Sequence, residues 1–378
     1  MTSVLFLAAT ERSPSVLKTN GLLRAARAYG WQVQTILPPA DSDCALRKIL
    51  DFWRPDGVIM DCGVRRAPPS RSVFGDVPVV FLGIDRSAGR NLFTACEDAQ
   101  ATARMAAREL LRLDCALYAF VPPDTPFRWS ELRAQHFRAA IRLNGKPYGE
   151  FVPPRFRDAA RRTRSLRAWL ARLPRPCGIL AADDRTATEV LGACATLRLR
   201  VPDDIAVLGV GNADPICESL RPTLSSIAQD FERSGFLAAR LLAARLHSPG
   251  MKPTSRTFPP LMVVRRASTR ARTSRDGEIA KAVALIRARA CEGLRAADVI
   301  RALNGSRRLV EMRFRKAVGH SILDEIQSVR MERAQELLLD PRRTLVAVAN
   351  MCGYASEAAF RKVYRAAFGK SPRGGSRR

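Results

Sequence analysis

Short apolar runs alternate with helix-periodic segments through the first 266 residues. The runs are rich in Val, Ile and Leu, and most contain no polar side chain, which is typical of strands buried on both faces of a parallel sheet. These predicted strands lie at residues 4–8, 33–37, 57–60, 79–82, 116–121, 178–182 and 205–210. Apolar residues at helical spacing predict helices between them, at 98–113, 129–143, 158–173, 186–199 and 230–246.

This alternation predicts an α/β architecture. Residues 1–266 are more than one sheet usually holds, so we expect two lobes. The pattern breaks near 113–115 and after 224–228, which predicts one lobe from roughly 1–113 plus 229–250 and the other from 114–228. A cleft between two lobes is a common place for a small ligand to bind.

The composition changes between residues 254 and 277, where Arg, Ser and Thr replace aliphatic residues from 265 onward. Such a segment buries too little apolar surface to offset the entropy lost on ordering. It therefore predicts a flexible linker, assigned to 267–277, behind an effector domain of residues 1–266. The linker arginines either contact phosphates or stay solvated.

The last hundred residues repeat one helical pattern after an interval of fifty. A Ser at the N-cap is followed by apolar residues four and eight positions later, which gives each helix one buried stripe. Ser306, Val310, Phe314, Arg315, Gly319 and Ser321 recur as Ser356, Phe360, Tyr364, Arg365, Gly369 and Ser371. A longer helix joins the two copies, and Thr344 and Gly353 bound a short helix before the second.

Each copy follows another short helix, so residues 278–373 predict an all-α domain with two helix-turn-helix units. Their outward side chains are candidates for contact with duplex DNA, because Arg suits guanine edges and a helix N-terminus favours a nearby phosphate. These candidates are Arg307, Arg308, Glu311, Met312 and Arg315 in the first copy and Glu357, Ala358, Arg361, Lys362 and Arg365 in the second. The alternative is a pair of ordinary amphipathic helices with solvated arginines, and the repetition argues against it.

The net charge of +27 favours a polyanionic partner, although the excess of Arg over Lys is also what a codon bias produces. Nine scattered cysteines without a CxxC pair predict free thiols and no metal site, which suits a reducing cytoplasm. The first residues lack the basic start of a signal peptide, and no run is long enough to span a membrane. We therefore expect a cytoplasmic protein with no membrane partner.

The tail resembles the DNA-binding domain of the AraC family of transcription regulators. The most specific stretch is Ala349-Asn-Met-Cys-Gly-Tyr-Ala-Ser-Glu-Ala-Ala-Phe-Arg-Lys-Val-Tyr-Arg-Ala-Ala-Phe-Gly-Lys-Ser-Pro372. The first part is similar to the effector domain of LacI/GalR-type regulators, through residues 203–214, 224–229 and 235–242. That resemblance implies a two-lobed fold like that of periplasmic binding proteins, with a sugar as the effector and a pentose as first candidate.

The resemblance implies five ligand-binding residues: Arg133, Asp183, Asp184, Asn212 and Gln229. Arg133 matches an arginine that holds sugar hydroxyls, and an unpaired Arg over a cleft suits that chemistry. Asp184 is equally well explained as a helix N-cap. The family pattern Gly-Val-Asp-Asn reads Gly209-Val-Gly-Asn212 here, so one expected carboxylate is absent.

The leading hypothesis is a sugar-responsive transcription regulator that needs no cofactor and acts as a homodimer on operator DNA, with RNA polymerase as a further candidate partner. A second hypothesis keeps DNA binding but has an effector domain that binds no sugar, or a different small molecule. A third is an enzyme. The three histidines form no triad or metal pattern, which argues against catalysis.

Overall fold

The chain divides into two units in the computed structural model, which describes residues 1–10, 13–38, 42–63, 65, 67–85, 91–154, 158–270, 277–303, 305–338, 343–368 and 371–372. The first unit comprises Met1–Met105, Val121–Ala140 and Ala228–Leu261. The second comprises Ala106–Phe120, Ile141–Ile227 and Met262–Arg378, so the helical tail belongs to it.

A six-stranded sheet forms the framework of the first unit. Its strands run in the order β11-β5-β4-β3-β1-β2. Their bounds are Ser3–Leu7 for β1, Gln32–Ile36 for β2, Gly57–Asp61 for β3, Val79–Leu82 for β4, Phe93–Glu97 for β5 and Ser255–Phe258 for β11. Neighbouring strands pair in parallel. The predicted parallel sheet is therefore confirmed, and β5 and β11 are additions to it.

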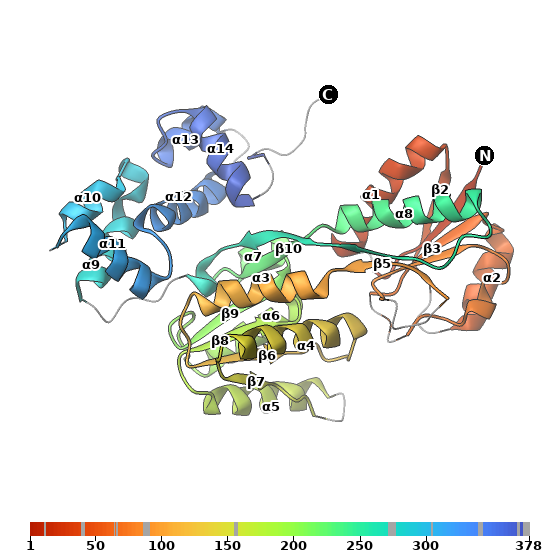
Figure 1. Ribbon diagram of the computed structural model, residues 1–378, viewed down its shortest axis with the longest axis horizontal. Helices are drawn as coiled ribbons and strands as arrows, with labels where there is room; N and C mark the ends of the chain where they lie inside the picture. Colours follow the sequence, from red (N-terminus) through yellow and green to blue (C-terminus); the bar gives the residue numbers. More distant parts are fainter. Residues whose placement is uncertain are drawn as a thin grey trace. The chain divides into compact units, whose positions relative to one another are not determined.

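Helices cover both faces of this sheet. Because successive side chains point to opposite faces of a strand, Val4 and Phe6 pack under α1 (Ser13–Tyr29) and α8 (Phe231–His247), whereas Leu5 and Leu7 pack against α2 (Asp43–Trp53). Figure 1 shows α1 and α8 side by side on one face and α2 on the other. Burial on both faces explains why β1, β3 and β4 contain almost no polar residues, whereas the edge strands β2 and β11 are partly exposed and mixed in sequence.

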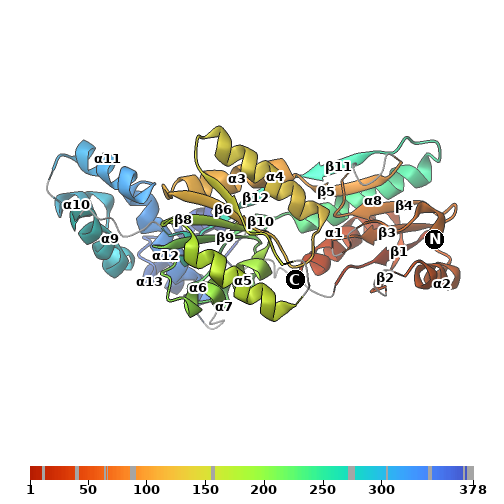
Figure 2. The same cartoon turned by 90° about the horizontal axis from the view of Figure 1, so that it is seen from below.

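The second sheet has the order β12-β10-β9-β8-β6-β7. Its strands are Leu117–Val121 (β6), Tyr148–Glu150 (β7), Cys177–Ala181 (β8), Ile205–Gly211 (β9), Ser225–Gln229 (β10) and Pro260–Val264 (β12). The remaining helices of the effector half are α3 (Ala99–Leu111), α4 (Arg128–Leu143), α5 (Ala159–Arg172), α6 (Asp184–Thr196) and α7 (Asp214–Ser219). Figure 2 shows α5 and α6 together on one face of this sheet.

The tail consists of six α-helices among its described residues. They are α9 (Gly277–Arg289), α10 (Ala296–Arg301), α11 (Arg307–Val318), α12 (Ile322–Leu338), α13 (Leu345–Met351) and α14 (Glu357–Phe368). Two small cores hold them, and α12 contributes Ile322 and Ile326 to one and Ala334 and Leu337 to the other. The two helix-turn-helix units are therefore joined by one continuous helix, as the sequence predicts.

The prediction of a flexible linker at 267–277 is wrong for residues 267–270, which are folded and buried or half-buried. Ala267–Thr269 form a short 3₁₀ helix that follows β12, and the residues just before it form β11 and β12. Ser268 and Thr269 are fully buried and Arg266 is 2% exposed. Polar side chains are buried here because hydrogen bonds replace the missing apolar contacts: the Ser268 hydroxyl donates to Val207 O at 2.6 Å. Residues 271–276 of the predicted linker lie outside the described residues.

Candidate nucleic-acid interface and effector site

The first repeated helix, α11, presents a basic face to solvent. The Ser306 hydroxyl caps it by accepting the Leu309 N–H at 3.3 Å, and Gly319 ends it with a φ of 86°. Its buried stripe is Val310, Phe314 and Val318. Of the five side chains predicted to point outward, Arg307, Arg308, Met312 and Arg315 are exposed and Glu311 is half-buried.

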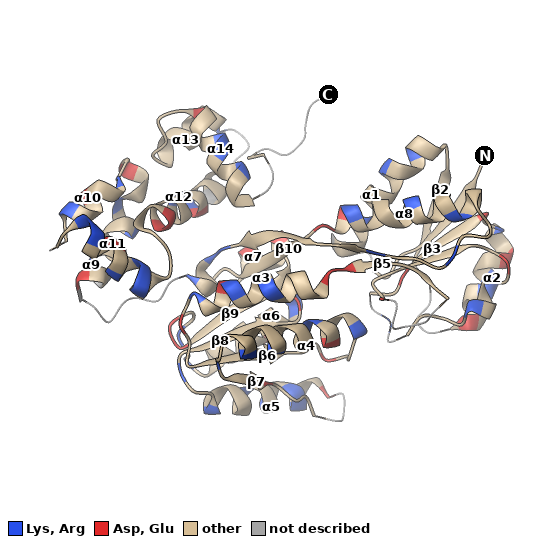
Figure 3. Cartoon of the chain, viewed as in Figure 1, with Lys and Arg blue, Asp and Glu red and all other residues tan. Residues whose placement is uncertain are grey.

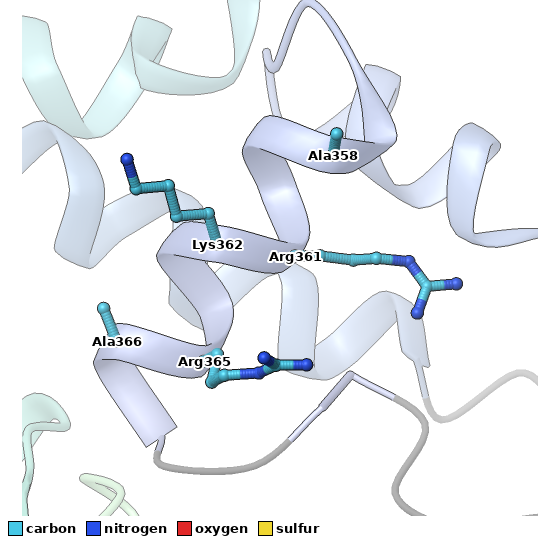
Figure 4. A pocket seen from close by; sticks show the side chains of 5 residues that line it. All are labelled: Ala358, Arg361, Lys362, Arg365 and Ala366. Carbon is cyan, nitrogen blue, oxygen red and sulfur yellow. The ribbon is translucent and has the colours of Figure 1, made fainter.

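The second repeated helix, α14, has the same organisation. Phe360 and Tyr364 are buried, and the Ser356 hydroxyl accepts the Ala359 N–H at 3.2 Å. A surface depression on the outer side is lined by Ala358, Arg361, Lys362, Arg365 and Ala366. Figure 4 shows Lys362 pointing to one side of the helix and Arg361 and Arg365 to the other.

Four of the ten candidate DNA-contacting side chains are exposed on α14: Ala358, Arg361, Lys362 and Arg365. The Glu357 carboxylate restrains one of them, Arg361. Arg361 Nε donates to Glu357 Oε1 at 2.6 Å, which holds the guanidinium against the helix. Figure 3 shows Lys and Arg on α11 and α14, the helices of the two repeated units. Each unit thus combines a short cationic helix with an apolar back, the form that fits a DNA major groove.

In the effector half, Arg133 is buried in the first unit and is not the unpaired arginine that we expected. It is 4% exposed, and its NH2 group donates to both Glu97 oxygens, at 2.5 and 2.6 Å. The guanidinium also lies 4.9 Å from the centre of the Trp129 ring. The expectation was wrong because Glu97 lies at the end of β5, a strand that the sequence pattern missed.

Gln229 is also buried in the first unit and has an unsatisfied acceptor. It is 5% exposed, and its Nε2 donates to Thr102 Oγ1 at 3.0 Å. Its buried Oε1 has no hydrogen-bond partner among the described residues. Because an unpaired buried acceptor costs free energy, such an oxygen is suited to accept a hydroxyl donor from a ligand.

In the second unit the N-cap of α6 is Asp183, not Asp184. The Asp183 side chain accepts the Thr186 N–H at 2.7 Å. Asp184 is 3% exposed and accepts from Ser226 Oγ at 2.5 Å and from the Ala213 N–H at 2.8 Å. Burial raises the pKa of Asp184, although these two hydrogen bonds oppose the rise.

Asn212 lies on the loop that follows β9, next to Asp184. Its backbone N–H donates to Ser226 Oγ at 3.0 Å, and its side-chain oxygen accepts from Arg266 at 2.9 Å. The structure thus brings Asp184 and Asn212 together around Ser226. Sequence reasoning missed Glu97, Trp129 and Arg266, and only the position of Glu97 at the end of an apolar run hinted at a role.

Gly211, which stands where the family pattern has Asp, adopts a φ of +126°. An added Cβ would lie 3.2 Å from Asp184 Oδ2, and a carboxylate there would face another. We therefore expect Gly211→Asp to lower the free energy of unfolding by about 1–3 kcal/mol rather than restore a sugar contact. Urea unfolding would measure this, with Gly250→Asp, at an open position, as control. Equal stability of the two variants would contradict it.

No group of three or more His, Cys, Asp and Glu side chains among the described residues is arranged to hold a metal ion. No helix in this part of the chain is long and apolar enough to cross a membrane.

Known proteins resemble the chain over both parts. Residues 98–269 match the family of periplasmic binding protein-like domains, and residues 299–378 match a family of helix-turn-helix domains. The xylose operon regulatory protein of Escherichia coli K12 is 30% identical over 343 residues, which cover 88% of this chain and 86% of that protein. The chain belongs to the xylose operon regulatory protein family. The Haemophilus influenzae protein of that name is 29% identical over 73% of this chain and 72% of its own length.

The solved structures agree with this family. The structure of the xylose-binding transcription activator xylR is 26% identical, with a TM-score of 0.62 over 98% of this chain and 96% of that one. The cellobiose complex of the transcriptional regulator CelR is 21% identical over 71% of this chain and 84% of its own, with a TM-score of 0.60, and shares the effector fold. Members of the family are transcription regulators rather than enzymes. The chain is a DNA-binding transcription regulator with a helix-turn-helix domain of the AraC type.

Proposed function

We propose that a small sugar, with D-xylose as the first candidate, controls DNA binding by this regulator through Arg133, Asp183, Asp184, Asn212 and Gln229. The similarity to a xylose operon regulatory protein across both domains is the observation that carries the proposal. The chemistry of the effector half supports it. A sugar offers hydroxyls that both donate and accept, and Gln229 Oε1 and the Arg133 guanidinium are buried groups of the matching kinds.

The stacking of Arg133 on Trp129 gives the proposal a second support. An aromatic ring beside a charged fork is suited to a sugar, whose ring has an apolar face and a polar rim. The ion pair with Glu97 holds the guanidinium in one orientation, so little side-chain entropy is left to lose on binding.

Calorimetric titration with D-xylose tests the ligand site. We expect Arg133→Lys to raise the dissociation constant about 10- to 150-fold, because Lys keeps the charge beside Glu97 but loses the planar fork of donors. Arg142→Lys, at an exposed position of the same helix, is the matched control and should bind like the parent. Failure of the parent protein to bind D-xylose or any other pentose would refute the proposal.

The second candidate function is DNA binding without sugar control, and Gly211 favours it because the family carboxylate is absent there. Calorimetric titration of the parent protein with D-xylose decides between DNA binding with and without sugar control.

We further propose a cytoplasmic homodimer that places two tails on one operator and contacts RNA polymerase. Sedimentation with and without DNA would test the dimer, and a purely monomeric complex with DNA would contradict it.

A further inference from the structure

Within the second unit, the turn between α11 and α12 packs directly on the end of α3. Gly319 occupies this turn, and an added Cβ there would lie 2.5 Å from the backbone oxygen of Arg112. The next residue, His320, brings its Nδ1 to 2.5 Å from Arg112 NH1. One side chain of the effector domain therefore contacts the point where the first helix-turn-helix unit meets the bridging helix.

The contact belongs to a row of four hydrogen-bonded side chains, Glu109, Arg112, His320 and Glu325, which is largely buried. Arg112 NH2 donates to Glu109 Oε1 at 2.7 Å, and His320 Nε2 lies 2.7 Å from Glu325 Oε2. The exposed fraction of the side chain is 2% for Glu109 and Glu325, 11% for Arg112 and 15% for His320. Charges that are withdrawn from water to this extent stabilise a structure only when each keeps its partner.

The row fixes the hydrogen position on His320. A guanidinium carries only donors, so Nδ1 must accept from Arg112 and the hydrogen must lie on Nε2, where it is donated to Glu325. A side chain at position 320 can therefore maintain the row only if it accepts on one side and donates on the other. A cationic side chain would meet Arg112 with like charge.

Residues 265–270, which lead from the effector domain into the linker, contact the same place. Arg265 Nε donates to Glu109 at 2.9 and 3.0 Å, and the backbone oxygen of Thr269 accepts from Arg112 at 3.2 Å. Arg270 then forms an ion pair with Glu332 on α12. Residues 265–270 thus connect the end of α3 to the middle of the bridging helix α12 through side-chain bonds.

The same segment, residues 265–270, is also bonded to the loop that carries Asn212. Arg266 donates to Asn212 Oδ1 at 2.9 Å and to Asp214 Oδ1 at 3.2 Å, and it pairs with Glu218. Its side chain is 2% exposed, whereas those of Asp214 and Glu218 are 45% and 42% exposed. A movement of Asn212 therefore changes the surroundings of the buried Arg266 guanidinium, which lies four residues before Arg270.

We propose that Arg112, His320 and the Arg270–Glu332 pair are positioning residues that lock α12 to the effector domain, and that Arg266 links this lock to the loop carrying Asn212. Because α12 contributes to the cores of both helix-turn-helix units, its orientation sets how both are presented to DNA. The response to ligand rests on the proposed function, whereas the lock itself is present without ligand.

The first experiment measures coupling in the full chain. The dissociation constant for a duplex, selected by the parent protein from a random pool, is measured by fluorescence anisotropy with and without saturating D-xylose. A regulated parent should change about 5- to 150-fold. We expect His320→Lys to bring this change within about 2-fold of none and His320→Gln, which both accepts and donates, to retain it. His247→Lys, on the exposed end of α8, is the control.

Parental coupling in His320→Lys, or an equal loss in His320→Gln and His320→Lys, would overturn the lock. Exchanging the charges of the Arg270–Glu332 ion pair tests the coupling between ligand and DNA without any change at His320. Arg270→Glu and Glu332→Arg should each reduce the coupling, and the double variant should return it to within about 3-fold of the parent. Loss in both single variants without recovery in the double would overturn the role of the pair.

Amide hydrogen exchange without ligand separates the lock from the proposed function. At residues 322–326, the start of α12, His320→Lys should exchange at least 10-fold faster than the parent, and His320→Gln should match the parent. If the parent binds no pentose but shows this difference, the proposed function fails and the lock stands. If exchange is the same in all three proteins, the lock is wrong whatever the ligand does.

Discussion

Replacing Gly235 by alanine is expected to destabilise the protein by about 3 kcal/mol or more. Gly235 on α8 faces α1, and an added Cβ would lie 1.9 Å from the backbone oxygen of Lys18. Gly21 on α1 has the reciprocal contact, 1.8 Å from the backbone oxygen of Glu232. Because both obstacles are backbone atoms, the helices must separate, and the core beneath them, which includes Leu22 and Ala238, must open.

The propensity of alanine for helices acts in the opposite direction but is too small to compensate, since it favours Ala over Gly by about 1 kcal/mol. Gly192, inside α6, is the matched control because a Cβ there meets nothing within 4 Å. Gly192→Ala should therefore be slightly stabilising in urea unfolding. An unfolding free energy for Gly235→Ala equal to that of the parent would show that α1 and α8 do not approach so closely.

Removing Arg308 or Lys362 is expected to weaken specific DNA binding by about 1–3 kcal/mol each, which is about 5- to 150-fold. Both side chains are exposed, on α11 and α14 respectively, so their loss leaves the folded cores intact. Because they lie on different helix-turn-helix units, footprinting should show Arg308→Ala and Lys362→Ala losing protection at separate stretches of the site. The double variant should lose about 2–6 kcal/mol if the effects add.

A nonspecific effect of charge would produce a different result. Arg164 on α5 is exposed. Replacing it by Ala removes one positive charge from the effector half, so Arg164→Ala should bind DNA like the parent. The salt dependence gives a further test, since each lost phosphate contact makes the negative slope of log K against log salt shallower by about 0.9. Identical footprint changes for Arg308→Ala and Lys362→Ala would refute separate roles for the two units.

The sequence predicted the tail more completely than the effector half. Its helix boundaries depend on local signals, such as the Thr344 hydroxyl, which accepts the Ala347 N–H at 3.2 Å, and Gly353, whose φ is +75°. In the effector half, the seven predicted strands are confirmed. Six of them are almost entirely apolar because they are buried on both faces, whereas β2 is a partly exposed edge strand. Among the described residues the pattern missed β5, β7, β10, β11 and β12. Three of them, β5, β10 and β11, contain Ser or Thr side chains whose partners lie far away in sequence, as in the 2.7 Å hydrogen bond from Thr94 to Ser255.

The candidate ligand site shows the same limit. Sequence resemblance selected Arg133 and Asn212, yet their surroundings depend on residues 36 and 54 positions away, Glu97 and Arg266 respectively. The spacing of apolar residues cannot predict such hydrogen-bonded pairs, because the two partners lie on different helices, strands or loops. The wrong prediction for the linker has the same origin, since hydrogen bonds to distant residues stabilise a segment whose composition alone favours disorder.

The amino-acid sequence by itself determined the two helix-turn-helix units and the parallel strands, because capping residues and apolar spacing act over a few positions along the chain. Tertiary structure alone decided that Arg133 is paired, that residues 265–270 are docked and that His320 lies between Arg112 and Glu325. Those arrangements follow from burial, which makes each charged group depend on whichever partner the fold brings within hydrogen-bond distance.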